Sequence, residues 1–227
     1  MFKYHKNDPS IQPSNFTFNI ILKVLSRSID HNPDAAIMAD KLLTEMDAMP
    51  SVTPDFISYV TCVIAWGRSK AENKIKRVST LLHRFVVSLE EHQDGNKKSS
   101  VVVFNAVLSV CHHNLSPELL AECFETAQVA MTELRKAKGI DHDQITYSSF
   151  FQVVKDGITI GGRPARSFFN LIEDEFRFCI NDGYVTRDIL MAFCQVVPKI
   201  IFAKYVGQHE DPETFSIPKA WSRNVAR

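Results

Sequence analysis

A short motif that returns four times at nearly constant spacing constrains the fold of this chain more than any other feature. In each copy an aromatic residue stands two places after a hydrophobic one. The four aromatic residues are Phe18, Tyr59, Phe104 and Tyr147, which are 41, 45 and 43 residues apart. Self-similarity at such a period is typical of repeat proteins, in which each unit packs against its neighbours to build one continuous core.

Each aromatic residue begins an apolar stripe with the spacing i, i+3, i+4, i+7, which predicts an amphipathic helix. The stripes are Phe18/Ile21/Leu22/Leu25, Tyr59/Cys62/Val63/Trp66, Phe104/Val107/Leu108/Cys111 and Tyr147/Phe150/Phe151/Val154, and Leu190/Phe193/Cys194/Val197 is a fifth. A second stripe follows each of the first four: Ala39/Leu42/Leu43/Met46, Val78/Leu81/Leu82/Phe85, Ala127/Ala130/Met131/Leu134 and the looser Phe169/Ile172/Phe176/Cys179. Because breakers separate the paired stripes and no strand pattern of useful length occurs, we expect an all-α fold of helical hairpins.

The spacing of the stripes gives the expected domain organisation. We expect an N-terminal extension (1–14), four repeats (15–55, 56–100, 101–143 and 144–186), a capping helix (187–206) and an irregular C-terminal tail (207–227). The glycine-containing segment Gly157–Pro164 is interpreted as the turn between the two helices of the fourth repeat. The hairpins should stack as a right-handed α-solenoid, with the first helix of each pair on the concave face.

Composition limits the function classes. The chain has 26 basic and 26 acidic residues, so its formal net charge is zero. This balance argues mildly against a strong non-specific binder of polyanions, but it leaves room for positive charge on one face. No apolar run approaches the ~18 residues of a membrane helix, and Met1–Asn15 shows neither a secretory signal nor an amphipathic presequence. We therefore expect no membrane partner, and either no targeting segment or one upstream.

Catalytic and metal-binding patterns are weak. Cys111, His112, His113 and Cys123 form the one Cys/His cluster in the sequence, and their spacing does not match structural zinc sites. Gly157–Pro164 is not followed by Gly-Lys-Ser/Thr, as a phosphate-binding loop would be. The sequence therefore predicts a protein that is not an enzyme and has no cofactor.

The stretch from Thr44-Glu-Met46 through Pro54-Asp55 into Phe56-Ile-Ser-Tyr59 resembles the pentatricopeptide repeat, as does Thr132-Glu-Leu134 through Asp143 into Tyr147. The resemblance covers about residues 15 to 186, and the tail Pro218–Val225 is similar to the closing segment of long-repeat members. Family repeats have about 35 residues, and the units here are longer. The roles of family residues can therefore be assigned to this sequence only loosely.

Proteins of this family typically bind single-stranded RNA, one base per repeat. The resemblance implies that a base is read by the residue after the aromatic together with the residue that closes the repeat. The implied base-reading pairs are Asn19 with Asp55, Val60 with Ser100, Asn105 with Asp143, and Ser148 with Thr186, the last with its register uncertain by one residue. The implied base-packing residues, two places before each aromatic, are Phe16, Ile57, Val102 and Ile145.

An Asn–Asp pair usually reads uracil in the family, because an amide can both donate to and accept from the pairing edge of that base. The places that would face the phosphates are Arg27, Arg68 and His113, with Asp156 in the fourth repeat. Position 105 follows the stripe residue Phe104, so we expect Asn105 to point away from the core.

Each assignment has a structural alternative. The asparagines and aspartates can simply begin helices, and the arginines can be ordinary surface residues. Two function classes therefore stay open. The first is a single-stranded RNA-binding adaptor, in a mitochondrion or plastid as the resemblance implies. The second is a protein-binding helical scaffold of the same shape, which the neutral charge and the apolar Val60 favour.

Overall fold

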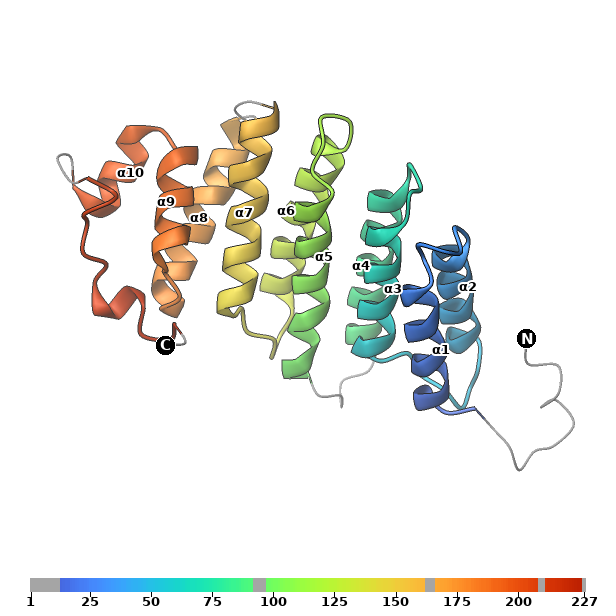
Figure 1. The fold of residues 1–227 in the computed structure, drawn as a ribbon. Helices are drawn as coiled ribbons and strands as arrows, with labels where there is room; N and C mark the ends of the chain where they lie inside the picture. The colour runs from blue at the N-terminus through green and yellow to red at the C-terminus, as the bar shows by residue number, and fades with distance from the viewer. Residues whose placement is uncertain (1–12, 92–96, 162–165, 208–210, 226–227) are drawn as a thin grey trace, which may run out of the picture.

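The computed structural model describes residues 13–91, 97–161, 166–207 and 211–225, and all the regular elements within these ranges are helices (Figure 1). The α-helices are α1 (Asn15–Arg27), α2 (Ala35–Asp47), α3 (Phe56–Arg68), α4 (Lys74–Glu91), α5 (Val101–His113), α6 (Leu120–Lys136), α7 (Gln144–Gly161), α8 (Arg166–Asp182), α9 (Arg187–Val196) and α10 (Lys199–Val206). Two 3₁₀ helices, η1 (Lys97–Ser100) and η2 (Lys219–Trp221), complete the described elements. The prediction of an all-α fold is confirmed. Most of the predicted N-terminal extension, residues 1–12, lies outside the described ranges.

The helices stand in two rows. α1, α3, α5, α7 and α9 contact one another in chain order, and α2, α4, α6 and α8 lie behind them (Figure 1). The predicted stripes face the space between the rows, where the aromatic residues Phe18, Tyr59, Phe104 and Tyr147 are almost fully buried. Trp66 is also buried, beneath the guanidinium of Arg77 at 5.3 Å from the ring centre. Packing of these stripes supplies most of the stability of the helices, since isolated helices of 13 residues are marginal in water.

Two expectations about helix boundaries are wrong. Gly157–Gly161 belongs to α7 instead of forming a turn. A β-carbon on Gly157 would lie 2.4 Å from the Phe124 ring, and one on Gly161 would lie 2.0 Å from Leu120, so the glycines allow α6 to approach α7 closely. The predicted capping helix is divided into α9 and α10 at Pro198, which cannot donate a helical hydrogen bond.

The C-terminal tail closes the end of the array at α8. The Val185 amide donates to the Trp221 carbonyl at 2.8 Å, and the Asn224 amide donates to the Gly183 carbonyl at 2.9 Å. The Trp221 and Phe176 rings are nearly perpendicular, with their centres 6.3 Å apart. The tail therefore covers apolar surface of α8.

Candidate functional site

The first turns of α1, α3, α5 and α7 all lie at the lower edge of the front row in Figure 1. The predicted base-reading and base-packing residues on these helices occupy this edge. We call it the base-reading edge, defined by the predicted pairs and by the four base-packing residues named above. The first turns of α3, α5 and α7 each follow a segment that carries the closing residue of the previous repeat.

Two of the predicted pairs are in contact across hairpin boundaries. The Asn19 side-chain nitrogen donates to both carboxylate oxygens of Asp55, at 3.2 Å each. The Asn105 nitrogen lies 3.1 and 3.2 Å from the two carboxylate oxygens of Asp143. Residues 36 and 38 positions apart in sequence are thus joined in the same way at two separate boundaries.

A hydroxyl group completes each contact. The Ser58 hydroxyl donates to the amide oxygen of Asn19 at 2.7 Å, and the Thr146 hydroxyl donates to that of Asn105 at 2.7 Å. We call each Asn–Asp–Ser/Thr group a clamp. The hydroxyl on the oxygen and the carboxylate on the nitrogen fix the orientation of the amide.

The aspartates also cap the next helix. The Asp55 carboxylate accepts from the Ser58 amide at 2.9 Å, and the Asp143 carboxylate accepts from the Thr146 amide at 2.8 Å. The backbone amide of Asp55 in turn donates to the Ser58 hydroxyl oxygen at 3.2 Å, which completes a capping box. Ser58 and Thr146 were missed by the sequence reasoning, although Asp-x-x-Ser and Asp-x-x-Thr before an apolar stripe are the sequence signal for this arrangement.

The clamps differ in accessibility. Asn19 is half-buried, whereas Asn105 is only 8% exposed. The expectation that Asn105 points away from the core is wrong, because α7 packs against α5 and covers it with Thr146 and Asp143.

The other two predicted pairs have no clamp. Ser100 is buried at the start of α5, and Val60 is half-buried and has no hydrogen-bonding group in its side chain. Ser148 is half-buried, and the Thr186 hydroxyl caps α9 by accepting from the Ile189 amide at 3.2 Å. The base-reading edge therefore alternates between a boundary with a clamp and one without.

The four base-packing residues are exposed although they are apolar. The exposed fractions are 74% for Phe16, 47% for Ile57, 39% for Val102 and 60% for Ile145. They recur in the first turn of each first helix, so apolar surface is spaced along the base-reading edge. Isolated exposed apolar side chains need no explanation, but their recurrence at one repeat position does.

The predicted phosphate-facing places are partly occupied by protein contacts. Arg68 donates to the Asp30 carboxylate at 2.9 Å and to the Ser26 carbonyl at 3.2 Å. His113 is exposed, with its Nδ1 atom 2.7 Å from the Ser109 carbonyl oxygen, and Arg27 is exposed. In the fourth repeat Asp156 lies 2.8 Å from the ring of His112.

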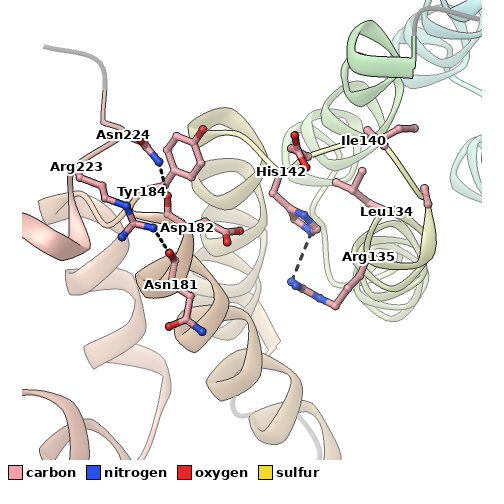
Figure 2. A pocket seen from close by; sticks show the side chains of 12 residues that line it. Leu134, Arg135, Ile140, His142, Asn181, Asp182, Tyr184, Arg223 and Asn224 are labelled. Atoms are coloured by element: carbon pink, nitrogen blue, oxygen red, sulfur yellow. Dashed lines mark hydrogen bonds between the residues drawn. The ribbon is translucent and has the colours of Figure 1, made fainter.

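A polar cavity of about 550 Å³ lies between the end of α6, the end of α8 and the C-terminal tail (Figure 2). Figure 2 shows Arg135 and His142 on one wall and Asp182, Tyr184 and Arg223 on the other. Most of these groups already have protein partners. Arg135 donates to the buried Glu175 carboxylate, the Tyr147 hydroxyl donates to Asp182 at 2.5 Å, and Arg223 donates to the Asn181 carbonyl.

Two groups beside this cavity titrate abnormally. Burial, helped by the positive charge of Arg135, lowers the pKa of His142 to about 4. Burial raises the pKa of Glu175 to about 7, although the Arg135 guanidinium acts in the opposite direction. These shifts follow from the burial of both groups beside Arg135 and need no ligand.

Metal binding and membrane insertion find no support in the described part of the chain. No group of three or more histidine, cysteine, aspartate or glutamate side chains is arranged there to hold a metal ion. None of the described helices has the length and apolar character needed to cross a membrane.

Comparison with known proteins gave no match: no family model, no curated protein and no solved structure matches this chain. Its function must therefore be inferred from the geometry of the base-reading edge.

Proposed function

We propose that this chain is a pentatricopeptide-repeat-like adaptor that binds single-stranded RNA along its base-reading edge. In this proposal the two rows of helices form a right-handed α-solenoid with the first helices on its concave face. The adaptor acts in RNA metabolism in a mitochondrion or plastid, where proteins of the family it resembles mostly work. The observation that carries the proposal is the pair of clamps at equivalent places of two boundaries.

The clamps suit the recognition of a pairing edge. The side-chain amide of asparagine has two N–H donors and two acceptor lone pairs. In each clamp the carboxylate accepts from one of the N–H donors, and the hydroxyl donates to one of the lone pairs. One donor and one acceptor remain for a base, which is the combination that meets a carbonyl and the adjacent N–H of uracil. The exposed apolar residue in the same first turn offers a surface on which bases can stack or pack.

The difference in burial between the clamps predicts which one discriminates more. A base can approach Asn19 more freely than Asn105, because Asn105 is covered by α7. Uracil preference should therefore depend chiefly on the first boundary. The boundary with Val60 should discriminate little, since no hydrogen bond is offered there.

Replacement of Asn19 tests the proposal. We expect the chain to bind a short oligo(U) more tightly than an oligo(A) at low salt, measured by fluorescence anisotropy. Asn19→Ala should weaken oligo(U) binding about tenfold, the equivalent of about 1.4 kcal/mol, because the oriented amide is lost. Asp55 should still cap α3 in this variant through the Ser58 amide, so circular dichroism should show an unchanged helical content.

The matched control is Asn170→Ala, an exposed asparagine on α8 in the second row, which should leave both affinities unchanged. If no RNA binds at low salt, or if Asn19→Ala changes oligo(U) and oligo(A) alike, the proposal is wrong.

A protein-binding scaffold is the second candidate, and one observation favours it. The places expected to meet phosphates carry little free positive charge, since Arg68 is paired with Asp30 and Asp156 occupies the fourth place. Failure of RNA binding together with a co-purifying protein whose capture depends on Ile57 or Ile145 would support this second function.

A further inference from the structure

Every hairpin after the first packs one of its sides against the preceding hairpin. We call this side the leading face of the hairpin. On α5, Val110 packs so closely on α3 that a β-carbon at Gly67 would lie 2.5 Å from it. Polar contacts flank this packing: Arg68 of α3 reaches the Ser26 carbonyl of α1, and Asn114 after α5 reaches the Gly67 carbonyl of α3 at 3.1 Å. In the second row, Arg77 of α4 reaches Asp40 of α2 at 2.5 Å.

The first hairpin has a leading face of the same kind that nothing covers in the described structure. Val24 holds the repeat position of Ala65, Val110 and Val153. Those three residues are 0%, 8% and 0% exposed, whereas Val24 is 61% exposed. Ile20, one turn earlier, is 48% exposed. Met38 of α2 holds the same repeat position as Arg77 of α4, which contacts the preceding hairpin. Val24, Ile20 and Met38 thus form an apolar surface at positions that serve as interfaces elsewhere in the chain.

Charge indicates what fits this surface. Within α1 the charged residues are Lys23 and Arg27, both basic. In α2, Asp40 and Asp47 are already paired with arginines of α4, while the other exposed charged side chains are Glu45, the adjoining Asp34 and the basic Lys41. Arg27 at the end of α1 and Asp34 before α2 therefore carry opposite charges on the leading face, so two copies can pair these residues across an interface.

We propose that the leading face of the first hairpin is the interface of a homodimer. α1 of each copy packs across α2 of the other, about a twofold axis parallel to these helices. Such an interface is isologous, so every contact occurs twice. Arg27 ends α1 and Asp34 precedes α2, so both lie at the same end of the hairpin. The twofold axis then places Arg27 of one copy beside the partner's Asp34, and it packs Val24 and Ile20 against the partner's Met38.

Analytical ultracentrifugation of the full chain over a wide concentration range tests the proposal. The average mass should rise from the monomer value of 25.8 kDa toward twice that value. Val24→Lys should raise the dissociation constant at least about tenfold, because a charge is inserted among apolar side chains. Since Val24 is exposed in the monomer, the fold should persist, as circular dichroism will verify. Ile200→Lys is the matched control, because Ile200 is 75% exposed on α10 at the other end of the array.

Charge reversal tests the twofold axis. Arg27→Asp and Asp34→Arg should each weaken the dimer, because each places like charges together, and the double variant should restore association. A constant monomer mass at all concentrations overturns the proposal. A dimer whose dissociation constant is unchanged by Val24→Lys overturns the proposed interface. A double variant that fails to restore association overturns the proposed twofold axis. Open-ended assemblies that Ile200→Lys disrupts would instead show head-to-tail association and would equally overturn it.

Discussion

Asp55 and Asp143 each serve two neighbours at once, as the cap of one helix and as the partner of an asparagine on the preceding first helix. Helix capping and pairing with an asparagine were alternatives in the sequence, and in the structure the same carboxylate does both. A carboxylate can accept several hydrogen bonds, so the helix start and the orientation of the amide do not compete. The clamp also contributes to stability, because it satisfies polar groups that the next first helix buries.

His142 provides a test at the same scale. Its ring stacks on Tyr147 with the centres 5.3 Å apart, and its pKa is about 4 in the folded chain against an ordinary 6.5. The unfolded state binds the proton more readily, so this contribution to stability is full above about pH 6.5 and is lost as the pH falls toward 4. His142→Phe keeps the stacking and removes this titration, so the variant should lose less stability than the wild type as the pH falls from 6.5 to 4, measured by urea unfolding at each pH.

Glu175 must be considered in the same profile, because its raised pKa of about 7 has the opposite sign. Its contribution is present at low pH and is lost as the pH rises through 7, in the wild type and in the His142→Phe variant alike. The difference between the two proteins therefore isolates His142. His83→Phe, at an exposed position of α4, is the control and should leave the slope between pH 4 and 6.5 unchanged. An unaltered slope in His142→Phe would contradict the prediction.

At the scale of elements, close packing between neighbouring helices depends on small residues at specific places. Gly67, near the end of α3, lets Val110 of α5 approach, and Gly157 and Gly161 do the same for α6 against α7. Glycine inside a helix is unfavourable by about 1 kcal/mol relative to alanine. The close approach of the neighbouring helices is therefore the physical reason for these glycines.

Gly67→Ala should destabilise the chain by about 1–3 kcal/mol, despite the better helix propensity of alanine. The added β-carbon would lie 2.5 and 2.8 Å from the two methyl groups of Val110, a stiff β-branched side chain. The double variant Gly67→Ala/Val110→Ala removes those methyl groups and should recover most of the loss. Urea unfolding of the two single variants and the double variant forms a double-mutant cycle. Additive effects would show that the helices adjust without strain.

At the scale of the whole molecule, the net charge is zero, but the charged residues are engaged differently in the two rows of helices. In the second row, Asp40 and Asp47 are paired with Arg77 and Arg84, which joins the first two hairpins. In the first row Arg27 is exposed, and Arg68 lies in an exposed pair with Asp30. An exposed ion pair contributes at most about 1 kcal/mol, so a phosphate can replace Asp30 as the partner of Arg68.

RNA binding should therefore depend only weakly on salt. About two phosphate contacts predict a slope near −1.4 for the logarithm of the binding constant against that of the salt concentration. Arg68→Ala should reduce this slope by about 0.7 and weaken all sequences alike. Lys41→Ala, at an exposed place on α2, should leave the slope unchanged. A steep slope in the wild type would indicate a phosphate-binding surface elsewhere on the molecule.

The sequence by itself determined the elements that depend on local spacing. An apolar residue every three or four positions specifies both a helix and its buried face. The stripes begun by Tyr59, Phe104 and Tyr147 are accordingly buried as predicted. Asp55 and Asp143 were singled out by their place in the repeat, and the resemblance paired them with the asparagines that they contact.

The tertiary structure decided what depends on neighbours far away in sequence. Asn105 is buried because α7 lies over it, and Arg68 is engaged because the turn between α1 and α2 brings Asp30 beside it. Gly157–Gly161 is helical because Leu120 and Phe124 of α6 pack against it, although glycines in isolation predict a turn. Periodicity is a local property that a sequence displays directly, whereas burial and ion pairing are set by how closely the hairpins approach one another.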